Sequence, residues 1–363
     1  MDSCLSKHAA LPLLPSRSRR LSGDRRLLVL PAMREVQYRS LVIMVATAGK
    51  NQYEPGSSLN APLRPRTSQG RFLRGLLLNK RHLFHYAAAD ELRLLADNRE
   101  AALARMCLSY GSDEASLHRR IAQLKERYCK TAVQEIMYML VLYKYSEIRV
   151  SLAPKLSRCI RNGRLQTWPK KDRELESIHS CDALELIKEH VNAVIGLRVN
   201  TCVSEKTQIQ KLHLRKVYVA SILCGYFLKS AALRHQLECS LPDLHGIGYL
   251  KGPVVSGSSL TIGTAHVATK EHLRQYITRF DPETVQRCTI PRTEEARNLI
   301  KKQCLALFGT EESDETIVTT YSSLKRLVLE AVAFGTFLWD TELYVDGAYK
   351  LNENAEEQEN RSI

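Results

Sequence analysis

The sequence feature that most constrains the fold is an apolar segment that occurs twice. Residues 214–228 read LRKVYVASILCGYFL, and residues 324–338 read LKRLVLEAVAFGTFL. Each copy has two basic residues near its start and is then apolar on nearly every side of a helix, so both should be buried helices. Both copies carry a glycine, Gly225 and Gly335, and a glycine costs about 1 kcal/mol relative to alanine inside a helix. These glycines are explained if another backbone passes close to them.

A second shared segment precedes each copy. Residues 184–196 (LELIKEHVNAVIG) align with residues 296–309 (ARNLIKKQCLALFG), and both end in a glycine of the kind that closes a helix. The order and spacing predict a duplicated helix pair in the C-terminal half. The predicted core of the repeat consists of the following residues: Gly225, Phe227, Leu228, Gly335, Phe337, Leu338 and Trp339.

The remaining folded chain also has helical periodicity, so we predict an all-α protein. Apolar residues recur at spacings of three and four throughout residues 70–150. A long helical segment in this region is expected to break near Cys129 because of its length. The predicted inward positions are Phe72, Leu76, Leu83, Tyr86 and Leu92, followed by a stripe of Leu117, Ile121, Leu124, Val133, Ile136, Leu140 and Tyr143.

Composition predicts the domain organisation. The leader has nine Lys or Arg against three acidic residues and is rich in Ser and Leu, which is typical of an organelle transit peptide; the alternative is a disordered basic tail. The predicted segments are a transit peptide (1–50), a linker (51–69), an N-terminal helical region (70–150), a basic connecting segment (151–179), helical repeat 1 (180–240), a flexible linker (241–268), helical repeat 2 (269–349) and an acidic disordered tail (350–363).

Charge and cysteine content narrow the class of protein further. The formal net charge is +14, but much of it belongs to the leader. The ten cysteines include no CxxC pair, which argues against zinc or redox sites and favours a reducing compartment. The longest apolar runs are shorter than the roughly 18 residues that a membrane span needs, so no transmembrane segment is expected.

Glu330 is the one carboxylate inside the second apolar segment. An acid or base catalyst would need a cleft and a partner group of different pKa, and the sequence indicates neither. Arg326 lies one helical turn earlier, so a buried ion pair between Arg326 and Glu330 is the favoured interpretation. Ala220 occupies the equivalent position in the first copy, so the repeat itself does not require an acid.

A basic segment, residues 144–173, contains nine Lys or Arg and two acidic residues. Basic residues beside an aromatic ring could contact nucleic-acid phosphates and stack on a base. The alternative is a solvated loop anchored by its tryptophan. The candidate polyanion contacts are Arg158, Arg161, Arg164, Trp168, Lys170 and Lys171.

Other motifs predict no further site. His82 and His85 lie three residues apart but lack a third ligand at a regular spacing, so helix packing or surface exposure is favoured over a metal. The stretch GPVVSGSSLTIGT (252–264) lacks the lysine ending of a phosphate loop. We therefore predict no catalytic, cofactor-binding or metal-ligating residues and no cofactor.

The segments SSLKRLVLEAVAFGTFLWDTE, FDPETVQR and LRKVYVASILCGYFLKSAALRHQLE resemble the plant UV-B-induced chloroplast protein family. This family is defined by a domain of unknown function that also occurs in seed-maturation-like proteins. The resemblance covers most of residues 67–349. It implies a plastid protein, a helical fold and a link to light stress, and it implies no activity.

Three functions stay open from the sequence. The first is a non-catalytic, soluble helical interaction or scaffold protein of the chloroplast stroma, linked to the UV-B response, with an unidentified protein partner. The second is a plastid RNA- or DNA-binding protein that uses residues 144–173. The third is an enzyme or small-ligand carrier with a pocket between the repeats, into which Glu330, Tyr218 or His213 would converge.

Overall fold

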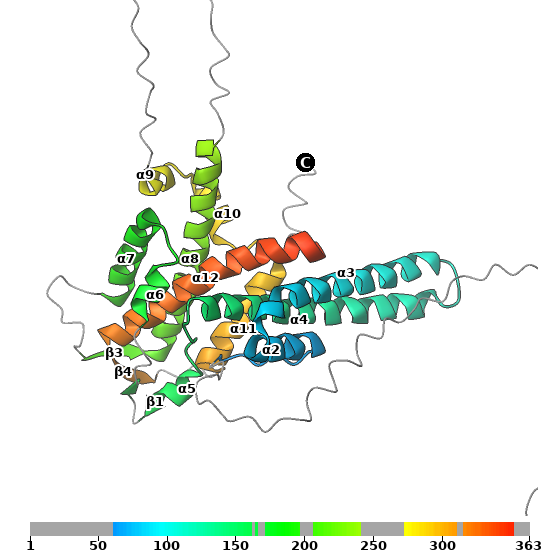
Figure 1. The fold of residues 1–363 in the computed structure, drawn as a ribbon, viewed down its shortest axis with the longest axis horizontal. Coiled ribbons are helices and arrows are strands. Elements are labelled where there is room, and N and C mark those ends of the chain that lie inside the picture. The colour runs from blue at the N-terminus through cyan, green and yellow to red at the C-terminus, as the bar shows by residue number, and fades with distance from the viewer. Residues whose placement is uncertain are drawn as a thin grey trace, which may run out of the picture. The chain divides into compact units, whose positions relative to one another are not determined.

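The computed structural model describes residues 61–161, 164–165, 171–196, 206–240, 272–310 and 315–351. Within these residues the chain is all-α, as predicted, with one small sheet (Figure 1). The predicted transit peptide, the flexible linker and residues 352–363 of the predicted acidic tail lie outside the described residues.

The N-terminal part is built from three main helices. Helix α2 (Ser68–Asn79) leads through the short η1 (Arg81–Leu83) to α3 (Phe84–Leu108), which turns back into α4 (Ala115–Glu147). The predicted connecting segment then contains α5 (Leu156–Cys159), β1 (Ile160–Arg161), β2 (Arg164–Leu165) and α6 (Asp172–Glu176).

The C-terminal part repeats one order of elements. It contains α7 (Cys181–Ile195), β3 (Lys206–Gln210) and α8 (Lys211–Ser240), and then α9 (Leu273–Thr278), α10 (Pro282–Thr289), α11 (Glu294–Phe308), β4 (Thr316–Thr320) and α12 (Tyr321–Tyr349). A helix, a five-residue strand and a long helix therefore occur twice in the same order.

The two long helices cross at their glycines. A Cβ atom on Gly225 would lie 1.9 Å from the carbonyl oxygen of Val332, and a Cβ on Gly335 would lie 1.9 Å from the carbonyl oxygen of Ile222. Because no side chain fits into such a gap, only glycine permits this approach of two backbones. The structure therefore confirms the prediction that another backbone passes close to each glycine.

The contacts around the crossing have two-fold symmetry. Gly225 and Gly335 are 110 positions apart, and so are the residues they touch, Ile222 and Val332. Strands β3 and β4 pair antiparallel about Gln208 and Val318, which have the same separation. The sheet order is β1-β2-β4-β3, so β2 extends the sheet beside β4 only.

The first helices of the two units have matching N-caps, and each is followed by a glycine with positive φ, although the ψ angles of the two glycines differ (29° and 178°). Ser180 caps α7 by accepting a hydrogen bond from the Ala183 amide, and Thr293 caps α11 by accepting one from the Ala296 amide. Gly196 and Gly309 follow the two helices with φ angles of 69° and 84°. Helix α7 packs against α12, and α11 packs against α8, so each unit covers the long helix of the other. The duplication of an ancestral unit stays a prediction that agrees with this geometry.

The predicted core residues of the repeat surround the crossing to different depths. Leu228, Phe337 and Leu338 are buried, together with the two glycines. Phe227 and Trp339 are half-buried; the Phe227 ring meets Phe280, while the Trp339 ring lies under the Arg292 guanidinium.

Helix α4 differs from the prediction in two ways. It is continuous through Cys129, which is fully buried, so the expected break is wrong. Cys129 packs against α3, where its thiol donates to the Leu95 carbonyl at 3.7 Å, so the helix continues through a position where length alone suggested an end. Several predicted inward residues are also exposed, namely Leu83, Tyr86, Leu117, Ile121 and Leu124.

The exposure of these residues follows from what α4 contacts. Before Cys129, α4 buries only Ala122, because its main neighbour along this part is α3, while α2 meets it at Tyr128 (Figure 1). From Cys129 onward α4 meets α2, α11 and α12, and it buries Val133, Ile136 and Leu140. We call the paired ends of α3 and α4, residues 99–128, the helical arm.

Of the described helices, α8 alone is long and apolar enough to cross a membrane by length and composition. Core helices meet the same criterion, and α8 here packs against α12 with its glycine at the crossing.

The crossing predicts opposite effects of two substitutions in α12. Gly335→Ala should lower the free energy of unfolding by about 3 kcal/mol or more, because its methyl group would overlap the Ile222 carbonyl. Gly347→Ala should raise it by about 0.5–1 kcal/mol, because nothing lies within 4 Å of the new methyl group and alanine favours the helix. Urea unfolding of both variants measures the difference, and equal effects would contradict the proposed role of the crossing.

Candidate functional site

Glu330 and Arg326 form a buried ion pair in α12. Arg326 Nη1 lies 3.0 Å from Glu330 Oε2, and both side chains are almost completely buried. The Ala153 amide donates to both carboxylate oxygens, at 3.0 and 3.1 Å, and Arg326 Nη2 donates to the Ser151 carbonyl at 3.1 Å. The pair therefore holds residues 151–153 against α12.

The surroundings of Glu330 favour a structural role over acid or base catalysis. Burial raises the pKa of Glu330, while the charge of Arg326 and the bond from the Ala153 amide act in the opposite direction. Tyr145 adds a hydrogen bond of 2.5 Å from its hydroxyl to the Glu330 carbonyl. Glu330 is fully buried and its carboxylate accepts from Arg326 and from the Ala153 amide, so within the described residues both of its oxygens are already engaged.

Two further glutamates hold neighbouring segments in the same way. Glu342 accepts hydrogen bonds from the Thr293 amide at 2.7 Å and from the Tyr226 hydroxyl at 2.5 Å, which fixes the start of α11 beside α8. Glu135 accepts from the amides of Arg66 and Thr67 at 2.8 Å, which fixes the start of α2. The sequence analysis missed both, although Glu342 lies one turn after the buried Leu338 and so continues its inward stripe.

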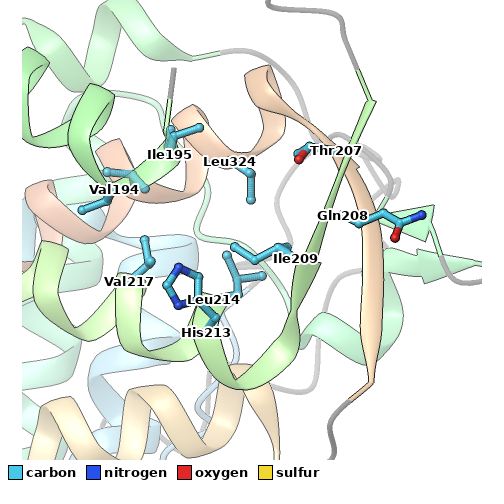
Figure 2. Close-up of a pocket in the computed structure, with 10 residues that line it drawn as sticks. Val194, Ile195, Thr207, Gln208, Ile209, His213, Leu214, Val217 and Leu324 are labelled. Carbon is cyan, nitrogen blue, oxygen red and sulfur yellow. The ribbon is translucent and has the colours of Figure 1, made fainter. Parts of the chain in front are cut away.

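A hollow of about 160 Å³ lies between the two repeats (Figure 2). Its walls are mainly aliphatic, and its polar residues are Thr207, Gln208 and His213. The predicted convergence of three polar groups is only partly present, because His213 lines the hollow whereas Glu330 and Tyr218 do not. The lining consists of Val194, Ile195, Thr207, Gln208, Ile209, His213, Leu214, Val217, Leu324 and Val328.

The predicted polyanion contacts that the structure describes are only partly brought together. Arg158 is exposed, and Lys171 makes an ion pair of 2.7 Å with Glu174. Arg161 and Arg164 pair through their backbones in β1 and β2. Trp168 and Lys170 lie outside the described residues, so the nucleic-acid interface stays a prediction.

The two histidines of the N-terminal region do not form a metal site with other ligands. His82 is exposed in η1, whereas the His85 ring packs edge-on against Tyr143 at 4.4 Å. Burial lowers the pKa of His85. Among the residues that the structure describes, no group of three or more His, Cys, Asp or Glu is placed to hold a metal ion.

The exposed apolar residues of the helical arm have the spacing of a coiled-coil seam. Leu117, Ile121, Leu124 and Tyr128 follow one another at intervals of four, three and four residues, and their exposed fractions are 57%, 37%, 51% and 44%. We call these four residues the α4 seam. The Tyr128 hydroxyl donates to Gln69 Oε1 at 2.9 Å, so the seam begins beside α2 and runs toward the tip of the arm.

Basic residues border the α4 seam on both sides. In a heptad that places the seam at positions a and d, the flanking positions e and g are occupied by His118, Arg120, Lys125 and Arg127. Three of these four are exposed, and His118 is half-buried beside Glu114. An apolar stripe with basic borders is suited to an amphipathic helix whose own borders are acidic.

These features define an all-α protein organised around two crossing helices. A family model described as a protein of unknown function (DUF760) matches residues 116–241 and 272–345. A UV-B-induced chloroplastic protein of Arabidopsis thaliana is 34% identical over 349 residues, which cover 86% of this chain and 82% of that protein. No solved structure matches.

The chain belongs to this family of UV-B-induced chloroplast proteins, as the resemblance of its motifs indicated. The chloroplastic relative also confirms the predicted chloroplast location. The stromal location and the transit peptide stay predictions.

The ion pair predicts a non-additive pair of substitutions. Glu330→Gln should lower the free energy of unfolding by about 3–5 kcal/mol, because it leaves the buried Arg326 charge without its partner. The double variant Arg326→Met, Glu330→Gln should recover most of this loss, because the amide oxygen still accepts from Ala153 and no charge is buried. Urea unfolding of the single and double variants tests this, and additive losses would contradict it.

Proposed function

We propose that the protein is a non-catalytic helical interaction protein of the chloroplast stroma that takes part in the UV-B response. In this proposal it binds an acidic amphipathic helix of a partner protein along the α4 seam. The observation that carries the proposal is the exposure of heptad-spaced apolar residues on an arm that the other described elements leave largely uncovered.

The heptad spacing supports a helical partner. Side chains at alternating intervals of three and four form one apolar line along a helix, and a second helix buries such a line by inserting its own side chains between them. Leu117, Ile121 and Leu124 are large enough to contribute substantially when removed from water, at about 25 cal/mol per Å² of buried apolar surface.

The borders of the seam support an acidic partner rather than a second copy of this chain. Pairing two α4 seams would place basic e and g positions opposite each other, and like charges at these positions oppose association. Glutamates at the same positions of a partner would face Arg120, Lys125 and Arg127. The partner is therefore expected to carry a helix with leucine-like residues at a and d and acids at e and g.

The link to the UV-B response rests on the relative, which is named for its induction by UV-B light. Nucleic-acid binding through residues 144–173 remains the alternative function, and no geometry of the described residues favours it over the seam. The two functions make different predictions about which probe binds.

We expect the full chain to bind a designed helical peptide that has Leu at positions a and d and Glu at positions e and g. A second peptide that has Lys in place of these Glu residues should bind at least about tenfold more weakly. Leu124→Glu should weaken binding of the acidic peptide by at least about tenfold, because it places a charge in the apolar seam and opposes the peptide's glutamates. Fluorescence anisotropy of labelled peptide measures both effects.

The matched control is Gln123→Glu, which adds the same charge at the neighbouring exposed position outside the seam. It should change the dissociation constant by no more than about twofold. Equal binding of the two peptides, or equal effects of the two substitutions, would reject the seam. Salt-sensitive binding of single-stranded RNA without binding of the acidic peptide would support the alternative function instead.

A further inference from the structure

The two-fold relation creates two equivalent contacts between the first helix of one unit and the long helix of the other. The side chains at these two contacts differ in size. On one side, α11 ends with Phe308, and its ring meets the ring of Tyr218 on α8 edge-on at 5.6 Å. Both rings are almost completely buried. A pair of aromatic rings thus closes the gap between the first helix of one unit and the long helix of the other.

The other side has smaller residues at the equivalent positions. The counterpart of Phe308 is Ile195, which precedes Gly196 as Phe308 precedes Gly309, and the counterpart of Tyr218, 110 positions later, is Val328. Both Ile195 and Val328 line the hollow of about 160 Å³. The hollow therefore lies where the related side holds two aromatic rings.

The size of the hollow is suited to one aromatic ring. An engineered apolar cavity of about 150 Å³ in another protein binds benzene. The inner wall of this more open and partly polar hollow is formed by Leu214, Val217, Leu324 and Val328, which are buried aliphatic residues.

Polar groups gather at one part of the lining. His213 and Gln208 are exposed, Thr207 is half-buried, and all three line the hollow. Figure 2 shows the imidazole of His213 beside Val217 and Leu214 at the edge of the apolar wall. A ligand with a hydroxyl group on its ring could bury the ring and direct the hydroxyl toward His213.

We propose that this hollow binds a single-ring aromatic compound with one polar substituent, of which phenol is the simplest. The ring takes the position that the Tyr218 and Phe308 rings occupy on the related side, and His213 orients the substituent. This inference does not depend on the α4 seam, which lies on a different helix.

The test is a titration of the full chain with phenol and with toluene, followed by isothermal calorimetry or saturation-transfer NMR. Phenol has about seven heavy atoms and is expected to bind in the hollow with a dissociation constant on the order of 1 mM. Val328→Tyr and Ile195→Phe each place a ring in the hollow, so each should weaken phenol binding at least about tenfold without lowering the melting temperature. Two variants at different positions are used so that a strained rotamer at one position does not decide the test.

Ala220→Tyr is the matched control, because it adds the same ring as Val328→Tyr at an exposed position of α8 outside the hollow. It should leave phenol binding unchanged. His213→Ala should reduce the preference for phenol over toluene, and an unchanged preference would reject the role given to His213. The proposal is overturned if phenol does not bind at about 10 mM, or if it binds the ring-filled variants as well as it binds the native chain.

Discussion

The close approach of α8 and α12 at Gly225 and Gly335 is the constraint on which the other contacts depend. Each glycine lies against a backbone carbonyl of the opposite helix, so neither helix can move outward without opening a gap in the core. Thr336 lies next to this contact, and its hydroxyl donates to the carbonyls of Gly225 and Val332. The packing of α7 against α12 and of α11 against α8, and the pairing of β3 with β4, follow from the same two-fold relation.

Three carboxylates, fully buried at Glu330 and Glu342 and half-buried at Glu135, then attach the remaining segments to this centre. Glu330 holds the start of the connecting segment, Glu342 holds the start of α11, and Glu135 holds the start of α2. Each accepts backbone amide hydrogens that no regular helix or strand would satisfy, and an unsatisfied buried amide costs about 1–3 kcal/mol. Glu330, the acid that most resembled a catalytic group in the sequence, is therefore one of three carboxylates that hold a segment by accepting hydrogen bonds from its backbone amides.

The sequence predicted the features that depend on neighbouring residues in one helix, and it missed those that depend on distant ones. The two glycines, the helix ends at Gly196 and Gly309 and the spacing of Arg326 and Glu330 are all local patterns. By contrast, the apolar stripe of α4 has the same period on both sides of Cys129, so periodicity could not show that only the later part is covered. The sheet was missed because its strands are at most five residues long. The hollow between the repeats was one of the possibilities left open, with His213 in its lining, but the sequence did not show that Glu330 and Tyr218 lie outside it.

Hydrogen exchange of the full chain, followed by mass spectrometry, tests the central claim that stability is concentrated at the crossing. The account predicts that amides in residues 217–228 and 327–338 exchange more slowly than those of every other described helix, because their opening requires unfolding of the core. It also predicts that residues 101–124 of the helical arm exchange much faster, since they bury few side chains. Exchange at the crossing that is as fast as exchange in the arm would contradict the account.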